Sequence, residues 1–358
     1  MLFFRYNLKG RVLKNHIVFP PVLCFGWSRN GEMTGEHLEH YRNVARGGAG
    51  LIISEVTCID AGARIDASQL GIWSDEFVEG YRNLARICHD EGVPLMAQIQ
   101  HGGVKAVTGT PVLPSKLTEA EIAAAGIEQK ANAARAGELD IAEIAAIETR
   151  FTDAARRLKE AGLDGVEIHG AHGFLLSYFL SSITNKRRDE YGGGLENRAR
   201  LVTGIIRAVR RECGEDFIIG VRYGGATPSL EDGIGFAKIF ESAGCDILHI
   251  STGATPLDAV EAPEKYAEFT SPVYTAVEIK KHVSIPVIAS NSVGTIDQAK
   301  LLVDGGLVDF AAFARNILAD YDWVRKTERG LEVNRCLRCK PCRWFKRALT
   351  ECPARRGG

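Results

Sequence analysis

Two histidines three residues apart, His169 and His172, follow the short apolar run 165–169. A run of this length is typical of a buried β-strand, and a long amphipathic helical pattern precedes it. We therefore expect both histidines at the carboxyl end of a strand. In a barrel of alternating strands and helices, that end carries the active site. Two imidazoles placed there can bind one oxygen atom of a ligand.

A second group of reactive side chains lies near the C-terminus, where Cys336, Cys339, Cys342 and Cys352 fall within 17 residues. Four thiolates from one short segment suit a [4Fe–4S] cluster. The same four sulfur atoms can hold a tetrahedral zinc ion. Segment 335–358 also contains eight Lys or Arg residues and one acidic residue, so a solvated basic tail with free thiols is a third interpretation.

The sequence contains eight short apolar runs that alternate with helical patterns, and the elements they predict must position these groups. Runs without polar alternation are typical of strands buried on both faces, hence of a parallel sheet. Eight such runs with intervening helices predict a (β/α)8 TIM barrel. The predicted strands are 16–19, 51–56, 94–100, 165–169, 218–223, 247–251, 286–289 and 310–313.

Capping signals predict three of the helices. Asp75 is expected to cap a helix that ends near residue 91, and Asp140 a helix that ends near residue 161. A third helix is expected over 196–213, because Gly214 follows it. Segment 105–139 is long for a connection after a strand, so we expect it to shape the active site.

Length and composition favour one large domain, a barrel over residues 1–334 with a cysteine-rich extension over 335–358. The 358 residues are 45% hydrophobic and 25% charged, with a net charge of −1, which argues against nucleic acid as a partner. We find no signal peptide and no run long enough to span a membrane. Nine cysteines without a secretory signal indicate a reducing compartment, so we expect a cytoplasmic protein.

The run 169–200, HGAHGFLLSYFLSSITNKRRDEYGGGLENRAR, resembles the signature of the old yellow enzyme family of FMN-dependent NADH:flavin oxidoreductases. Further similarity lies in LGIWSD at 70–75, QIQHGG at 98–103 and VDF at 308–310. The resemblance implies that His169 and His172 bind a carbonyl or phenolate oxygen above the flavin, with Phe174 beside the substrate. Donors aimed at a developing enolate oxygen lower the barrier to hydride addition.

The resemblance also implies which residues contact FMN. Four of them, Pro20, Pro21, Val22 and Leu23, would lie along the isoalloxazine ring, with Val56 nearby. Gln98 would bond its pyrimidine edge, and Arg222 would lie near flavin N1, where positive charge favours the reduced anion. The phosphate would bind at two loops, made of Ser290, Asn291 and Ser292 and of Ala314 and Arg315.

Four positions depart from the family pattern. Many relatives have a tyrosine at position 174 that protonates the substrate α-carbon, and Phe174 has no proton to give, so Tyr178, Tyr223 or a water would have to supply it. Leu23 replaces a Thr or Cys near flavin O4. Asn291 and Ser292 replace glycines in the phosphate loop, although both can donate hydrogen bonds and Asn tolerates left-handed backbone.

The implied activity is hydride transfer from reduced FMN to an alkene activated by a conjugated carbonyl. NAD(P)H or an iron–sulfur cluster would reduce the flavin, since the tail resembles the segment after the barrel in the dienoyl-CoA reductase and trimethylamine dehydrogenase branch. We find no Gly-x-Gly-x-x-Gly fingerprint, so a cluster would need an electron-donor protein. An oxidative flavoenzyme for amines or alcohols, an electron-relay subunit and a flavin-free phosphate-binding barrel are the alternatives. Self-association is expected from the relatives.

Overall fold

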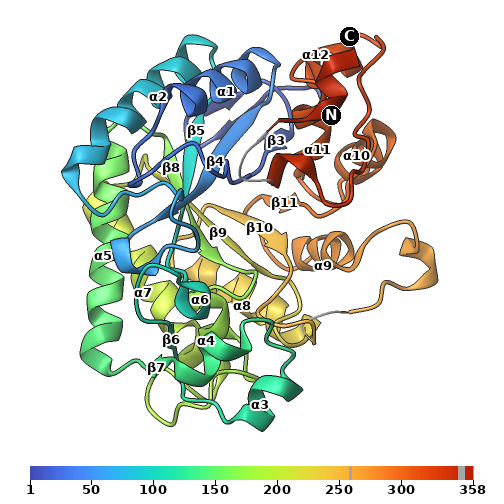
Figure 1. Cartoon of the computed structure of the whole chain (residues 1–358). Helices are drawn as coiled ribbons and strands as arrows, with labels where there is room; N and C mark the ends of the chain where they lie inside the picture. The colour runs from blue at the N-terminus through green and yellow to red at the C-terminus, as the bar shows by residue number, and fades with distance from the viewer. Residues whose placement is uncertain (258–259, 346–350, 358) are drawn as a thin grey trace.

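Eight parallel strands close into a barrel in the order β10-β11-β12-β3-β4-β5-β8-β9, so the predicted (β/α)8 fold is confirmed (Figure 1). The structure is a computed structural model that describes residues 1–257, 260–345 and 351–357. Each strand lies at a predicted apolar run: β3 Ile17–Phe19, β4 Leu51–Cys58, β5 Leu95–Gln100, β8 Gly165–Gly170, β9 Ile218–Gly224, β10 Ile247–Ser251, β11 Val287–Ala289 and β12 Phe310–Ala312.

Helices cover the outside of this barrel. They are α1 Gly35–Arg46, α2 Val78–Asp90, α5 Ile141–Glu160, α7 Leu195–Cys213, α8 Leu230–Ser242, α9 Ser271–Lys280, α10 Ile296–Asp304, α11 Arg315–Ala319 and α12 Trp323–Glu328. Asp140 caps α5 as predicted, because its carboxylate accepts the N–H of Glu143 at 2.8 Å. The predicted cap by Asp75 is wrong, because Asp75 lies inside the first turn and its carboxylate instead accepts from Arg157 of α5 at 2.6 Å.

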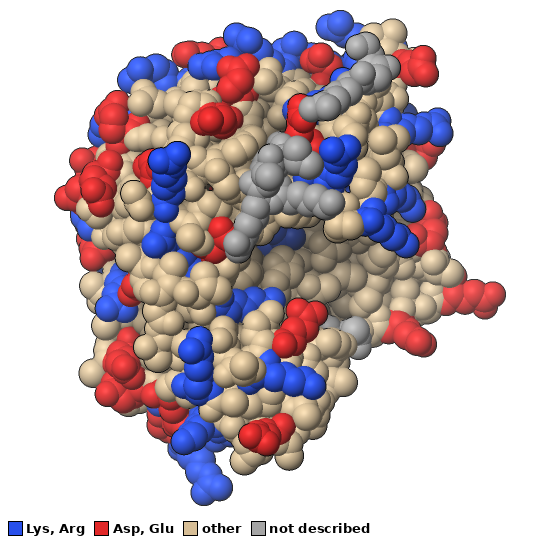
Figure 2. Space-filling model, viewed as in Figure 1, with Lys and Arg blue, Asp and Glu red and all other residues tan. Residues whose placement is uncertain are grey.

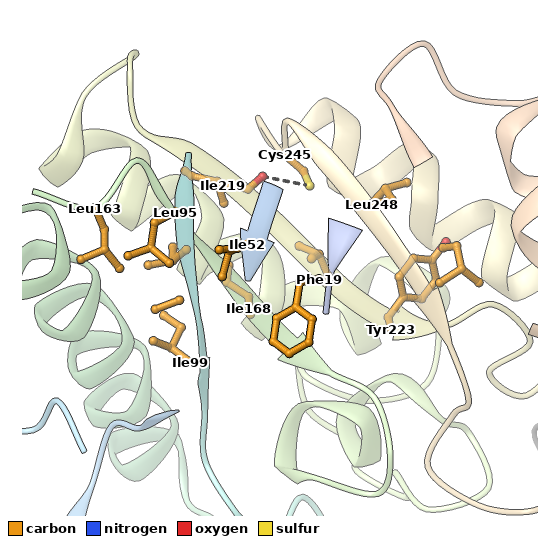
Figure 3. Packing of buried hydrophobic residues seen from close by; sticks show 14 of the residues in the cluster. Phe19, Ile52, Leu95, Ile99, Leu163, Ile168, Ile219, Tyr223, Cys245 and Leu248 are labelled. Carbon is orange, nitrogen blue, oxygen red and sulfur yellow. Dashed lines mark hydrogen bonds between the residues drawn. The ribbon is translucent and has the colours of Figure 1, made fainter. Parts of the chain in front are cut away.

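Strand residues alternate between the barrel interior and the layer between strands and helices. Phe19, Ile52 and Ile168 belong to this outer layer and project from β3, β4 and β8 (Figure 3). At the amino ends of the strands, the interior is filled by a smaller apolar cluster that includes Val18, Ile53 and Met96. Gln98 and Glu167 lie farther along their strands than this apolar cluster.

A hairpin that the sequence analysis did not predict closes the amino end of the barrel. Strands β1 Tyr6–Leu8 and β2 Arg11–Leu13 pair antiparallel, and Leu8 and Leu13 join the interior cluster. Each strand has only three residues, and exposed side chains interrupt its apolar pattern. Such short strands carry little periodic signal.

The segment after β5 folds into a lobe beside the carboxyl end of the barrel. The lobe contains η3 Gly103–Lys105, β6 Val112–Leu113, α3 Glu119–Ala124, α4 Lys130–Arg135 and β7 Gly137–Glu138. It has its own hydrophobic cluster, which Val104, Leu113 and Ile122 build. Tyr178 of α6 Leu175–Leu180 packs into that cluster.

The C-terminal segment packs on the barrel largely through aromatic side chains. Trp344, in η5 Arg343–Phe345, is 1% exposed, and its indole N–H donates to the carbonyl of Leu23 at 3.2 Å. The guanidinium of Arg355, in η6 Pro353–Gly357, lies 4.3 Å from the ring centre of Tyr321. The described tail residues therefore contact the loop after β3 and the segment between α11 and α12.

Candidate active site at the carboxyl end of the barrel

Four polar side chains form a layer inside the barrel, one on each of four consecutive strands. Gln98 of β5 is paired in register with Glu167 of β8, and Arg222 of β9 with His249 of β10. All four are buried, although their groups are charged or polar. Burial of such groups is unfavourable unless each finds a partner.

Glu167 is the partner of two members of this layer. Its carboxylate accepts from Gln98 Nε2 at 2.7 Å and from His249 Nδ1 at 2.7 Å. Strand β9 separates β8 from β10, so the bond to His249 crosses the inside of the barrel. Burial lowers the pKa of Arg222, and the Glu167 carboxylate opposes that shift. Glu167 thus provides negative charge beside the Arg222 guanidinium.

The histidine pair lies closer to the opening of the barrel than Glu167, at the end of β8 and in the loop after it. His169 ends β8 and is paired in register with Arg222, while His172 follows in the left-handed region with a φ of 60°. His169 Nε2 and His172 Nδ1 are 2.9 Å apart, so the two imidazoles share a hydrogen bond. The ring of Phe174 lies 4.7 Å from the ring of His169, centre to centre.

Ser251, at the end of β10, holds His172 from the other side. Its hydroxyl oxygen lies 2.5 Å from His172 Nε2 and accepts from Asn291 Nδ2 at 3.0 Å and from Arg222 Nη2 at 3.4 Å. Amide and guanidinium groups can only donate here. The serine hydroxyl must therefore direct its own hydrogen toward His172 Nε2.

Both imidazoles are neutral near pH 7. Burial, reinforced by the positive charge of Arg222, holds the pKa of His169 and of His172 well below the ordinary value. A neutral His172 that accepts at Nε2 carries its hydrogen on Nδ1 and donates it to His169 Nε2. His169 then carries its hydrogen on Nδ1, which is buried and has no hydrogen-bond partner among the described residues. The pair thus presents one unused donor.

Other buried atoms at this end also lack partners. Arg222 Nε and His249 Nε2 have none within the described part of the chain. Unpartnered buried polar atoms are costly, and they indicate that another group completes the site. Figure 2 shows that the face seen in Figure 1 is hollowed between the lobe and the C-terminal segment. His249 Nε2 is an acceptor, because Nδ1 of the neutral ring donates to Glu167. The unpartnered donors Arg222 Nε and His169 Nδ1 fit a flavin, whose ring carries carbonyl and ring-nitrogen acceptors.

The other residues predicted to contact FMN lie around the same end. Pro20, Pro21, Val22 and Leu23 follow β3 directly, and three of these four are buried. Val56 lies in β4, next to the irregularity where the pairing with β5 shifts between Ser54 and Thr57. Cys24 is fully buried in the outer hydrophobic layer, and its backbone N–H donates to Glu55 at 3.0 Å.

The two predicted phosphate loops lie next to each other. Ser290, which follows β11, donates from its hydroxyl to the carbonyl of Ile250 at 2.7 Å. Asn291 and Ser292 have φ values of 66° and 92°. Arg315 begins α11, after Ala314, and donates to the hydroxyl of Ser292 at 3.2 Å. The structure therefore brings both predicted loops together.

Sequence reasoning named Tyr223 as a candidate proton donor, and the structure places it elsewhere. Strand alternation directs Tyr223 outward when Arg222 points inward. The Tyr223 hydroxyl donates to the carbonyl of Gly233 in α8 at 2.8 Å, and its ring packs against Phe240. That hydroxyl is outside the barrel interior.

Sequence reasoning also missed Glu167, His249 and Ser251. Each lies in a predicted strand at a position that alternation directs inward, and a buried polar residue among apolar neighbours was the available signal. Their partners come from strands distant in the sequence, so no local motif marks them.

The four tail cysteines are half-buried free thiols. Burial raises the pKa of Cys352, with smaller contributions from Cys336 and Cys342. Across the described residues, which include all four cysteines, no group of three or more His, Cys, Asp or Glu side chains is placed to hold a metal ion. This arrangement does not fit the predicted iron–sulfur or zinc site, so we derive no chemistry from one.

None of the described helices is long and apolar enough to cross a membrane.

The model of the NADH:flavin oxidoreductase / NADH oxidase family matches residues 1–334. The chain is 35% identical over 355 residues to an NADH oxidase of Thermoanaerobacter brockii, an alignment that covers 94% of this chain and 52% of that protein. This chain thus spans about half the length of that relative.

Two further comparisons extend over nearly the whole of both proteins. The chain is 34% identical over 338 residues to an NADPH dehydrogenase of Geobacillus sp. (strain WCH70), covering 90% of this chain and 92% of the relative. It superposes on an old yellow enzyme homologue from Zymomonas mobilis with a TM-score of 0.79 and 26% identity, covering 98% and 97%. The chain therefore belongs to the NADH:flavin oxidoreductase / NADH oxidase family, the family of the old yellow enzymes.

Proposed function

We propose that this protein is an ene-reductase that adds hydride to an alkene conjugated with a carbonyl group. Bound FMN supplies the hydride. The observation that carries the proposal is the neutral, hydrogen-bonded pair of His169 and His172, which leaves one buried donor, His169 Nδ1, without a partner among the described residues.

His169 Nδ1–H donates to the carbonyl oxygen and gains strength as negative charge develops there. His172 fixes the orientation of His169, and Ser251 fixes that of His172. Arg222 and Lys105 add positive charge near the pair, since both contribute to the lowered pKa of His169. The site is thus suited to an oxygen that becomes an enolate.

The residues around the pair would hold the cofactor. Gln98 and Arg222 would contact the flavin ring, with Val56 and the segment 20–23 along it, and the loops at 290–292 and 314–315 would bind the phosphate. We propose NADH or NADPH as the electron donor, because the relatives are named for both nicotinamides. We also propose, from the family resemblance alone, that an electron-donor protein could reduce the flavin and that the chain associates with further copies of itself.

Replacement of His169 and His172 by Ala together tests the assignment. Phenols titrated into the oxidised holoenzyme should produce a long-wavelength charge-transfer band, and the double variant should lose it while retaining flavin. His282→Ala, on an exposed turn after α9, is the control. Unchanged phenol titrations in the double variant would contradict the assignment.

Phe174 favours a second candidate, the oxidation of an amine or alcohol, because such a reaction needs no proton donor at that position. Anaerobic addition of amines to the oxidised enzyme would bleach the flavin in that case. Reduction of enones by photoreduced enzyme supports the first proposal instead. Metal analysis of protein purified without air tests the predicted iron–sulfur or zinc site of Cys336, Cys339, Cys342 and Cys352.

A further inference from the structure

Hydride addition to an enone leaves an enolate whose α-carbon must take up a proton, so the proposed function requires an acid near the histidine pair. Phe174 cannot supply it, and the hydroxyl of Tyr223 donates to Gly233 outside the barrel. Tyr178 is 1% exposed and packs in the hydrophobic cluster of the lobe. Tyr178 thus packs among apolar side chains of the lobe, and Tyr223 is directed away from the barrel interior.

Lys105, the last residue of η3, reaches this place from the lobe. Its ammonium nitrogen lies 5.2 Å from the ring centre of Phe174. It donates to the backbone carbonyl of His172 at 2.8 Å. Since the ring of Phe174 also contacts His169, the Lys105 ammonium is separated from the oxygen-binding imidazole by one aromatic ring.

The backbone between His172 and Phe174 allows this approach. Gly173 has a φ of 67°, and a Cβ atom added to it would lie 3.3 Å from Lys105 Cε and 3.5 Å from Nζ. The same Cβ would meet the carbonyl of Ala254 at 3.0 Å. A side chain at position 173 would therefore crowd the lysine, and glycine leaves it room.

The positive charge of Lys105 affects the pKa of both histidines. Partial burial lowers the pKa of Lys105, and the carboxylate of Glu128 opposes that shift. Lys105 in turn contributes to the lowered pKa of both His169 and His172. A lysine with a lowered pKa is a stronger acid than an exposed one.

We propose that Lys105 donates the proton to the substrate α-carbon, which makes it a catalytic residue; the inference rests on the proposed function. An N–H bond of the ammonium group breaks, and the electron pair of the enolate forms the new C–H bond. Lys105 is left as a neutral amine, and water returns its proton. The substrate gains one hydride and one proton in total.

A nitroalkene separates the two steps, because hydride addition to it gives a nitronate that is stable until carbon is protonated. Photoreduced Lys105→Met holoenzyme should reoxidise its flavin within about threefold of the wild-type rate and release nitronate, seen by its ultraviolet absorbance. The wild type and Lys116→Met, an exposed lysine of the same lobe, should release nitroalkane. Wild-type flavin that the nitroalkene does not reoxidise would overturn the proposed function instead.

NMR of the protein with ¹³C-methylated lysines measures the pKa of Lys105 without turnover. The Lys105 resonance is assigned because it is absent from the spectrum of Lys105→Met. We expect that resonance to titrate below the ordinary lysine value of about 10.5. Lys105→Gln repeats the product test if the Met variant loses flavin. Nitroalkane as the product of both variants, or a Lys105 that titrates at or above the ordinary value, would overturn the role of Lys105.

Discussion

At the residue scale, Glu167 decides the charge of the layer beneath the histidine pair. It accepts hydrogen bonds from Gln98 and His249, and it lies near the Arg222 guanidinium. A buried guanidinium without a counter-charge is unfavourable. The same guanidinium would favour an anionic reduced flavin. Glu167 therefore stabilises the folded site and would moderate the positive charge near a bound flavin.

Glu167→Gln keeps the side-chain shape and removes the charge. Arg222 would then be less compensated, so the flavin reduction potential should rise by about 20–60 mV, which corresponds to about 1–3 kcal/mol for one charged hydrogen-bond partner in a two-electron couple. Equilibration with a reference dye measures the shift. Glu148→Gln, on α5 outside the barrel, should leave the potential unchanged. A potential that stays constant or falls in Glu167→Gln contradicts this role.

The sequence predicted the two histidines as site residues because they belong to the long run 169–200, and Arg222 because it lies in a predicted strand at a position that the family resemblance places near flavin N1. Lys105 was missed, since its position beside Phe174 depends on how the lobe folds back over the opening of the barrel. Ser251 was missed for a similar reason, because its three partners come from β9 and from the loops after β8 and β11. Contacts of this kind follow from barrel closure, which no local pattern encodes.

At the element scale, the turn between β11 and α10 carries two non-glycine residues in left-handed backbone. Asn tolerates this region better than most residues, whereas Ser292, with a φ of 92°, is strained there. Asn291 also gains a hydrogen bond to Ser251, and Ser292 accepts one from Arg315. The turn thus has strained backbone at residues whose side chains form hydrogen bonds with Ser251 and Arg315.

Ser292→Gly should relieve the strain and raise the free energy of unfolding by about 1 kcal/mol, since glycine populates this backbone region freely. Asn291→Gly should gain less, because it loses the bond to Ser251. Ser292→Ala keeps the strain, loses the hydroxyl and should destabilise. Urea unfolding of the three variants measures the order, and a Ser292→Gly variant less stable than the wild type would contradict the account.

Strands were predictable wherever they are buried on both faces, because a short continuous apolar run such as that of β8 is typical of a strand inside a parallel sheet. The hairpin β1–β2 and the short elements of the lobe were not, since strands of two or three residues have no periodicity. Helix starts were predictable only in part. The cap predicted at Asp140 is present. The cap predicted at Asp75 is not, because the Asp75 carboxylate accepts a hydrogen bond from Arg157 of α5, a partner 82 residues away.

At the scale of the whole molecule, several histidines are buried in neutral form. Burial lowers the pKa of His37 to about 4, of His40 to about 3 and of His101 to about 4. In the unfolded chain each would titrate near its ordinary value of about 6.5. Between pH 6.5 and 4 the unfolded state therefore binds more protons than the folded state, and the free energy of unfolding must fall as pH falls.

The buried carboxyl group of Glu55 acts in the opposite direction. Burial raises the pKa of Glu55 to about 7, so between about pH 4.5 and 7 the folded state holds a proton that the unfolded state has lost. The three histidines outnumber Glu55, and each net proton corresponds to about 1.4 kcal/mol per pH unit. Urea midpoints of the flavin-saturated protein should therefore decrease steeply from pH 6.5 to 5. His40→Gln, which can still bond the Tyr321 hydroxyl but cannot titrate, should show a shallower slope. Equal slopes in the two proteins, or midpoints independent of pH in this range, would show that these histidines do not govern the acid stability of the barrel.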